Sequence, residues 1–121
     1  MLIAGPVAVV IDGDGFRCGQ TAVRLLGIDA PDYRRSRPCR GGFGDHVCDD
    51  GGARQAKERL RAGLRLGPVR IEPVGQDRYG RTLAMAWAGR VNLNCRQLQV
   101  PGVRYIVRYD NGGRVARTCG R

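Results

Sequence analysis

Four aspartates in the first third of the chain are spaced so that their carboxylates can act together. Asp12 and Asp14 lie two residues apart in VVIDGDGF, and Asp29 and Asp32 end the stretch VRLLGIDAPD. In an extended segment, residues two apart point to the same side. If the two segments are neighbouring strands, up to four carboxylates converge at one end of a sheet. A cation would offset their repulsion, and ligands that are all oxygen favour calcium or magnesium over zinc.

Arg24 lies in the second of these stretches, where a purely structural strand needs no arginine. Hydrolysis of a phosphodiester passes through a five-coordinate transition state that gathers negative charge on its equatorial oxygens. A cation and guanidinium groups can stabilise that charge. The alternatives are structural. Arg24 would then pack by its aliphatic stem, and DGDG would be a tight turn, because Asp and Gly are common turn formers.

Several other kinds of site are disfavoured. An EF-hand requires a ligand and a glycine at its fifth and sixth loop positions, where this chain has Phe16 and Arg17. The sequence contains no GxxxxGK[ST] motif, which excludes a nucleotide-binding P-loop. The single histidine, His46, disfavours nucleases that use a histidine base.

The charge balance points to a polyanionic partner. The formal net charge is +10, and every one of the 21 basic residues except Lys57 is arginine. Arginine presents a planar donor fork that matches phosphate oxygens two at a time, so nucleic acid is the expected partner. A GC-rich genome, which encodes arginine readily, is the alternative explanation for this composition.

The five cysteines suggest disulfides, which form in oxidising compartments. We expect two disulfides and an unpaired, buried Cys18. The remaining four allow three connectivities: Cys39, Cys48, Cys95 and Cys119. The alternative is zinc bound by Cys39, His46 and Cys48, although that spacing fits no standard zinc pattern. Oxidised cysteines would indicate a secreted or periplasmic protein.

The elements that must position these residues are strands first. Residues 7–18 are expected to form two strands around a glycine-rich turn, and residues 21–29 follow as the next strand of a meander. Two further strands are expected at 68–74 and 81–89, joined by the polar turn GQDRYG. Because the apolar start runs directly into this pattern and has no basic n-region, we interpret it as folded structure and not as a signal peptide.

A long exposed loop and two helices complete the prediction. Residues 33–52 have no hydrophobic periodicity and are rich in Gly and Arg, which indicates a loop. Asp49 and Asp50 stand at a helix N-terminus, and the apolar residues that follow have helical spacing: Ala53, Ala56, Leu60 and Leu64. The opposite face is basic. A second helix is expected at 91–99.

Together these elements predict one α+β domain over residues 1–121, built around a small β-barrel. A chain of this length closes one hydrophobic core, and no apolar run approaches the roughly 20 residues of a membrane span. We therefore expect no membrane partner, and we expect a monomer.

Four motifs together resemble the thermonuclease family, the staphylococcal-nuclease-like enzymes. They are VVIDGDGF, VRLLGIDAPD, GQDRYGRTLA and VN at 91–92, in the family's order over roughly residues 7–109. The resemblance implies a five-stranded OB-fold barrel with one or two packed helices. It also implies a nuclease that cleaves DNA and RNA with Ca²⁺ and little sequence specificity, with single strands preferred. The chain ends soon after Tyr109, so we expect the family's C-terminal helix to be absent and DNGGRVARTC to form a short strand.

The same resemblance assigns roles around the acidic cluster. Asp14 and Asp29 would bind calcium directly, together with the main-chain carbonyl of Ala30, and Asp12 would be an outer carboxylate. Asp32 occupies the place of the family's glutamate, which is proposed to act as general base, and it is one methylene shorter.

The remaining roles concern phosphate and substrate. Arg24 and Arg81 would bind the scissile phosphate. The expected substrate-binding residues are Arg78, Tyr79, Tyr105 and Tyr109. The alternative is a noncatalytic OB-fold module that binds single-stranded nucleic acid through its arginines. A third interpretation, a disulfide-stapled basic inhibitor or toxin, leaves the four ordered motifs unexplained.

Overall fold

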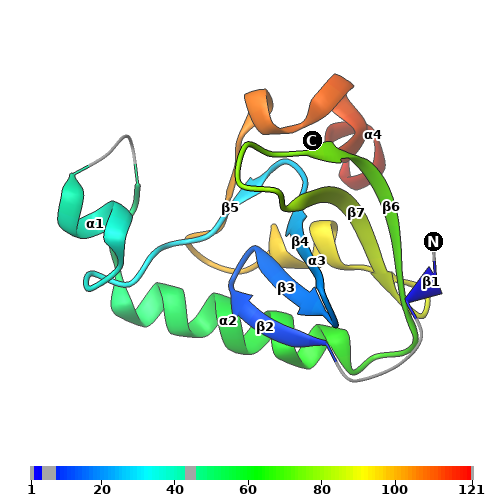
Figure 1. The fold of residues 1–121 in the computed structure, drawn as a ribbon, viewed down its shortest axis with the longest axis horizontal. Coiled ribbons are helices and arrows are strands. Elements are labelled where there is room, and N and C mark those ends of the chain that lie inside the picture. Colours follow the sequence, from blue (N-terminus) through cyan, green and yellow to red (C-terminus); the bar gives the residue numbers. More distant parts are fainter. Residues whose placement is uncertain (1, 4–7, 43–45, 121) are drawn as a thin grey trace.

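The computed structural model describes residues 2–3, 8–42 and 46–120, and it confirms a mixed α+β architecture (Figure 1). Residue 7, where the first strand was expected to begin, and residues 43–45 of the expected loop lie outside the described residues. None of the helices in the described ranges is long and apolar enough to cross a membrane.

A seven-stranded sheet forms the centre of the fold. Its strands follow the order β1 (Leu2–Ile3), β6 (Val69–Gln76), β7 (Thr82–Ala88), β4 (Thr21–Leu25), β3 (Gly15–Cys18) and β2 (Val9–Asp12), and β8 (Val91–Asn92) also pairs with β7. All pairs are antiparallel except β4 with β7. Within the described part of the chain, this path of pairings does not close on itself. A separate pair consists of β5 (Ile28–Asp29) and β9 (Arg104–Tyr105).

The expected meander at the start of the chain is confirmed for three strands, but the strand expected over residues 21–29 ends at Leu25, and Ile28–Asp29 form β5 in the separate pair. Val10 pairs with Phe16, and Phe16 pairs with Val23, so buried apolar side chains line one face of three successive strands. Gly19 has a φ of 58° in the turn between β3 and β4, a left-handed conformation that glycine adopts without a Cβ clash. The hairpins hold the DGDG turn at one end of the sheet.

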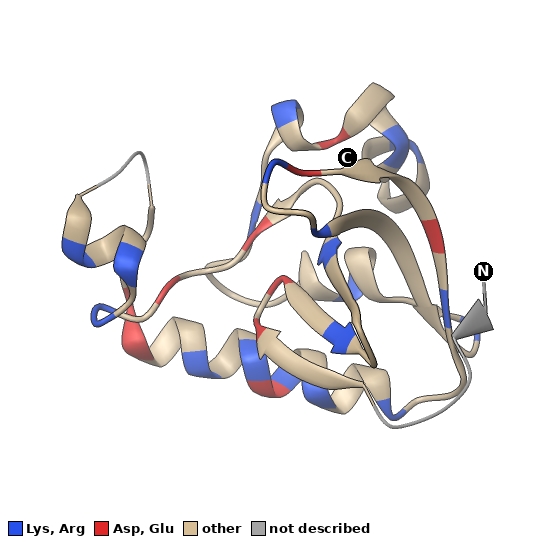
Figure 2. Cartoon of the chain, viewed as in Figure 1, with Lys and Arg blue, Asp and Glu red and all other residues tan. Residues whose placement is uncertain are grey.

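The long helix α2 (Asp50–Leu64) packs against β2, β7 and the short helix α3 (Leu93–Gln97). All four predicted apolar residues of α2 are buried, and basic residues lie along the helix in Figure 2. Asn92 caps α3, because its side-chain oxygen accepts a hydrogen bond from the backbone N–H of Cys95 at 2.9 Å. The two helices and the sheet enclose the core.

Residues 33–52 are more ordered than the sequence predicts. They contain the short helix α1 (Arg37–Gly41), and α2 begins at Asp50. Pro38 lies in the first turn of α1, where its missing N–H is not needed. The end of the segment pairs with Asp32, whose N–H donates to Val47 (2.8 Å) and whose carbonyl accepts from Asp49 N–H (2.9 Å). Only a part of this stretch is therefore an irregular loop.

The C-terminal residues form no strand, which corrects the expectation for DNGGRVARTC. The 3₁₀ turns η1 (Val107–Tyr109) and η2 (Asn111–Gly113) lead into α4 (Arg114–Cys119), so a short C-terminal helix is present. Buried Asp110 explains the difference. Its carboxylate accepts hydrogen bonds from the backbone N–H groups of Val115 (2.7 Å) and Ala116 (3.0 Å), which stabilises the first turn of a helix.

The cysteines form two disulfides, Cys39–Cys48 and Cys95–Cys119, and Cys18 is free and buried, as expected. This selects one of the three connectivities that the sequence left open. It also excludes zinc binding by Cys39 and Cys48, because both sulfur atoms are used in the same bond.

Candidate active site

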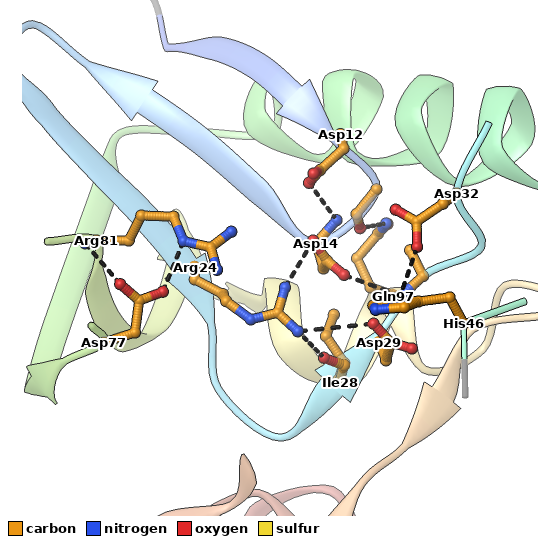
Figure 3. A network of polar contacts seen from close by, with 12 residues as sticks. Asp12, Asp14, Arg24, Ile28, Asp29, Asp32, His46, Asp77, Arg81 and Gln97 are labelled. Carbon is orange, nitrogen blue, oxygen red and sulfur yellow. Dashed lines mark hydrogen bonds and ion pairs between the residues drawn. The ribbon is translucent and has the colours of Figure 1, made fainter. Parts of the chain in front are cut away.

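An ion pair between Asp14 and Arg24 lies at the centre of the candidate site. Asp14 lies in the turn between β2 and β3, and Arg24 on β4 pairs in register with Gly15. This register places Arg24 Nη1 2.9 Å from Asp14 Oδ1 (Figure 3). The two side chains are only 14% and 7% exposed, so the pair is well shielded from solvent. The hairpin therefore fixes a buried carboxylate against a buried guanidinium.

The next strand brings a second carboxylate to the same guanidinium. Arg24 Nη2 donates to the carbonyl of Ile28 (3.2 Å) and lies 3.7 Å from Asp29 Oδ1. The backbone N–H of Ala30 donates to Asp14 Oδ2 at 2.9 Å, which ties the β5 segment to the DGDG turn. Arg104 on β9 pairs with the other oxygen of Asp29 at 2.8 Å. Asp14, Asp29 and Ala30 thus form one contiguous group.

Burial and neighbouring charges shift the pKa values of Asp12, Asp14 and Asp32. Burial first, and then the neighbouring charge of Asp14, raises the pKa of Asp12 to about 8. Burial acts in the same direction on Asp14, but Arg24 outweighs it and holds the pKa of Asp14 below its usual value. The pKa of Asp32 is raised by burial first and then by the charges of Asp14 and Asp29. The charges of Asp14 and Asp29 therefore act on Asp32, although Asp29 lies on β5, which pairs with β9, and not on a strand next to β3 as the sequence predicted.

This group fits a hard divalent cation. All three candidate ligands supply oxygen, and a cation would offset the repulsion that, after burial, helps to raise the pKa of Asp12 beside Asp14. Among the described residues, no group of three or more His, Cys, Asp or Glu side chains is arranged to hold a metal ion. Asp14 and Asp29 would therefore need the carbonyl of Ala30 and water to complete the coordination.

Asp32 follows Ala30 at the edge of the acidic group, and its side chain is 25% exposed. His46 Nδ1 lies 3.2 Å from Asp32 Oδ2. The charge and hydrogen bond of His46 oppose the rise in the pKa of Asp32. A partly exposed carboxylate beside buried ones is accessible to water.

Arg81 reaches the site from another part of the chain. Arg24 pairs with Leu83 across the parallel β4–β7 contact, so Arg81, two residues before Leu83, continues the alternation on the side of Arg24 (Figure 3). Asp77 holds Arg81, with Oδ2 2.6 Å from Nε and Oδ1 2.9 Å from the backbone N–H. Arg81 remains 35% exposed beside the buried Arg24. Arg24 and Arg81 thus provide one buried guanidinium and one that is accessible to solvent.

The candidate substrate-binding residues differ in their surroundings. Tyr79 is 69% exposed, and the guanidinium carbons of Arg78 and Arg81 lie 5.1 and 5.6 Å from the centre of its ring. Tyr109 lies beside the site, with its ring 5.5 Å from the Arg24 guanidinium carbon. Tyr105 instead donates its hydroxyl to Asp110 at 2.6 Å, which raises the pKa of Tyr105. Of the two C-terminal tyrosines, Tyr109 is the one that contacts Arg24.

Four residues that contact the site were not assigned to it from the sequence. His46 and Arg104 contact candidate catalytic or ligand carboxylates, Asp77 holds Arg81, and buried Gln97 donates to the carbonyls of Gly13 (2.7 Å) and Ala56 (3.0 Å). Asp77 had a local signal, because it opens the polar turn that ends at Arg81. Gln97 had none, since a polar residue in a short helix is normally expected at the surface.

The fold and site define an α+β sheet domain that carries buried carboxylates paired with arginines. The staphylococcal nuclease homologue family matches residues 22–102, about two thirds of the chain. The chain therefore belongs to the staphylococcal nuclease homologue family. A search of the curated proteins gives no match.

Proposed function

We propose that the protein is a calcium-dependent nuclease that hydrolyses phosphodiester bonds of DNA and RNA with little sequence specificity. The observation that carries the proposal is the contact of Arg24 with both candidate metal ligands, Asp14 and Asp29. A noncatalytic nucleic-acid-binding surface has no need for buried acids among its arginines, because they weaken the attraction for phosphate. A hydrolytic centre needs the negative carboxylates that bind a cation and the positive guanidinium that binds phosphate in one place.

Each side chain has a role in this proposal. Arg24 and Arg81 bind the scissile phosphate and stabilise the charge on its nonbridging oxygens. Asp32 accepts a proton from water as the water oxygen forms a bond to phosphorus. The bond between phosphorus and the leaving sugar oxygen then breaks, and that oxygen takes its proton from solvent. Calcium, when bound by Asp14, Asp29 and the carbonyl of Ala30, supplies Lewis-acid stabilisation of the phosphate charge.

We also propose that the main sheet is the family's five-stranded OB-type barrel. Five consecutive strands of the pairing path support this interpretation: β2, β3, β4, β7 and β6. The other two strands, β1 and β8, contain only two residues each. β1 extends the sheet beyond β6, β8 pairs with the end of β7, and both add little to the sheet.

The proposed substrates are extended single strands, and the proposed state is a monomer. Exposed Tyr79 and Tyr109 can stack on bases that a duplex would hide, and arginines flank both rings. We also propose an oxidising location, either periplasmic or secreted, because the two disulfides would be reduced in a typical cytosol.

A noncatalytic OB-fold module that binds single strands is the second candidate. The +10 net charge and the arginine–tyrosine contacts favour it equally. The two candidates differ in cleavage. The module would bind single strands and leave them intact with or without calcium.

The decisive experiment measures degradation of plasmid DNA, single-stranded DNA and RNA with calcium, and again with excess chelator. We expect cleavage only with calcium, and Asp14→Asn should abolish it while retaining the circular dichroism spectrum of the unmodified protein. Calorimetric titration should show calcium binding to the unmodified protein and none to Asp14→Asn. Undiminished cleavage in chelator, or by Asp14→Asn, would contradict the assignment of the metal site. Tight binding without any cleavage would favour the noncatalytic module.

A further inference from the structure

His46 is brought to Asp32 by a segment that the chain holds in two independent ways. The disulfide Cys39–Cys48 closes the segment two residues after His46. Asp32 and Cys48 also form a parallel β-bridge, supported by the backbone hydrogen bond from Asp32 N–H to the carbonyl of Val47. The backbone of Asp32 and the backbone that follows His46 are therefore joined, and the approach of His46 does not depend on the side chains alone.

The contact between His46 and Asp32 joins one nitrogen of the imidazole to one oxygen of the carboxylate. His46 Nδ1 lies 3.2 Å from Asp32 Oδ2, and the two side chains are 34% and 25% exposed (Figure 3). An ionised carboxylate can only accept hydrogen bonds, so the Nδ1–H of His46 is the donor. One carboxylate oxygen is thereby engaged by the imidazole. The other oxygen is the one that can accept a proton from water.

Asp32 needs such a partner because its side chain is shorter than the glutamate that the family has at this place. A carboxylate with one rotatable bond fewer than glutamate reaches less far, and its two oxygens exchange places by rotation about a soft terminal torsion. A general base must hold its accepting atom within hydrogen-bond distance of the attacking water. The contact of Asp32 Oδ2 with His46 restricts rotation about this terminal torsion, so Oδ1 points in one direction.

We propose that His46 is a positioning residue for Asp32, delivered by the disulfide-closed segment, so that the Asp32–His46 pair serves as the general-base unit of this nuclease. The inference rests on the proposed nuclease function, which it deepens. His46 acts through Asp32, and the proton from water goes to the aspartate.

Three variants test this role by steady-state kinetics at saturating calcium. His46→Ala should lower kcat by about tenfold to a hundredfold, as expected for a misplaced catalytic group, with KM little changed. His46→Asn keeps an N–H donor near the position of Nδ1 and should recover most of the lost kcat. Val47→Ala is the matched control, since its exposed side chain neighbours His46 and its backbone remains in place. Equal loss in His46→Ala and His46→Asn, or no loss in either, would overturn the proposal.

A double-mutant comparison separates a positioning role from a structural one. If His46 acts through Asp32, His46→Ala should cause no further loss of kcat in an Asp32→Ala background. A further loss of the same size as in the unmodified protein would show that His46 acts independently of Asp32, and the proposal would be wrong.

Nuclear magnetic resonance of the metal-free protein gives a readout that does not depend on activity. The nitrogen shifts of the neutral His46 imidazole should identify the Nδ1–H form, and Asp32→Ala should return the ring to the ordinary Nε2–H form. Shifts that do not respond to Asp32→Ala would exclude the pair. If the protein cleaves nothing, the nuclease proposal fails, whereas these shifts still decide whether His46 and Asp32 are paired.

Discussion

Arg24 lies against both aspartates of the candidate metal group, 2.9 Å from Asp14 Oδ1 and 3.7 Å from Asp29 Oδ1. The shorter contact gives Asp14 a lowered pKa and gives Arg24 a raised one, each against the opposite effect of burial. The guanidinium of Arg24 therefore favours the ionised carboxylate of Asp14 in the metal-free protein.

Replacement of Arg24 by lysine should show whether the site needs only the positive charge of Arg24 or also its planar shape. Arg24→Lys keeps one positive charge but loses the planar fork that contacts Asp14, Ile28 and Asp29. We expect kcat to fall by about 10²–10³-fold, the scale seen when one donor to a transition-state oxygen is removed. The measurement is single-turnover cleavage of a defined oligonucleotide, with Arg17→Lys on the exposed strand surface as control. A kcat within twofold of the unmodified enzyme would show that the fork of Arg24 is not used.

Gly13 should tolerate no side chain. A Cβ at this position would lie 2.5 Å from the Cβ of Ala56 and 2.7 Å from the Cβ of Ala30, so the DGDG turn would have to move away from α2 and from the candidate ligand. Gly13→Ala should lower the free energy of unfolding by about 1–3 kcal/mol, as overpacking does, and weaken calcium binding. Gly75→Ala is the control, because nothing lies within 4 Å of its Cβ. Equal melting temperatures for the two variants would contradict this packing.

Asp77 should stabilise the fold in a pH-dependent way. Burial alone would raise its pKa, but hydrogen bonds from Arg81 and Tyr79 outweigh this and lower the pKa below its ordinary value of 3.8. A lowered pKa in the folded state means that the stabilisation is complete above pH 3.8 and is lost as the pH falls below that value. Asp77→Asn should therefore cost about 1 kcal/mol at pH 7, and the difference should shrink at acidic pH.

Urea unfolding of the unmodified protein and Asp77→Asn from pH 7 to pH 3 measures this difference. Glu58→Gln serves as the comparison, since Glu58 pairs with Arg61 on the exposed face of α2 and should matter less. A difference that stays constant with pH would show that the ionised carboxylate of Asp77 contributes nothing beyond its hydrogen-bonding shape.

Gln97 should hold the DGDG turn against α2. Its Nε2 donates to the carbonyls of Gly13 and Ala56, and the side chain is fully buried. Gln97→Met keeps the volume and removes both donors, so it should lower the free energy of unfolding by about 2 kcal/mol and weaken calcium binding. Gln99→Met, at an exposed position, should change neither quantity. Unchanged stability of Gln97→Met in thermal melts would contradict the anchoring role.

The sequence predicts best what local patterning determines. The apolar face of α2 and the alternation in the first three strands depend on short-range periodicity, and the structure has both. The closeness of Asp14 and Arg24 could also be predicted, because short turns leave neighbouring strands little choice of partner. The error at the C-terminus occurs where one side chain decides between alternatives that local patterning leaves open. Asp110 stabilises α4 from within the same stretch, by accepting hydrogen bonds from the backbone N–H groups of Val115 and Ala116.

The site residues that the sequence did not reveal are placed by tertiary contacts. Arg104 reaches Asp29 only because β9 pairs with β5, about 75 residues away in the chain. His46 reaches Asp32 through a segment without hydrophobic periodicity, whose path is set by the Cys39–Cys48 disulfide and one β-bridge. No pattern in a single sequence states which cysteines pair.

The parallel pairing of β4 with β7 has a consequence for the order in which the protein folds. Asp12, Asp14 and Arg24 belong to hairpins whose strands follow one another directly, and Asp29 follows β4 closely in the chain, whereas Arg81 joins them only after β7 has docked beside β4. Contacts between distant segments form slowly, because the entropy of closing the intervening chain is lost before the contact stabilises it. We expect the acidic half of the site to assemble early and the second guanidinium to arrive with the final collapse. A chain that is still folding would then form its candidate cation site before Arg81 reaches the position in which it can bind phosphate.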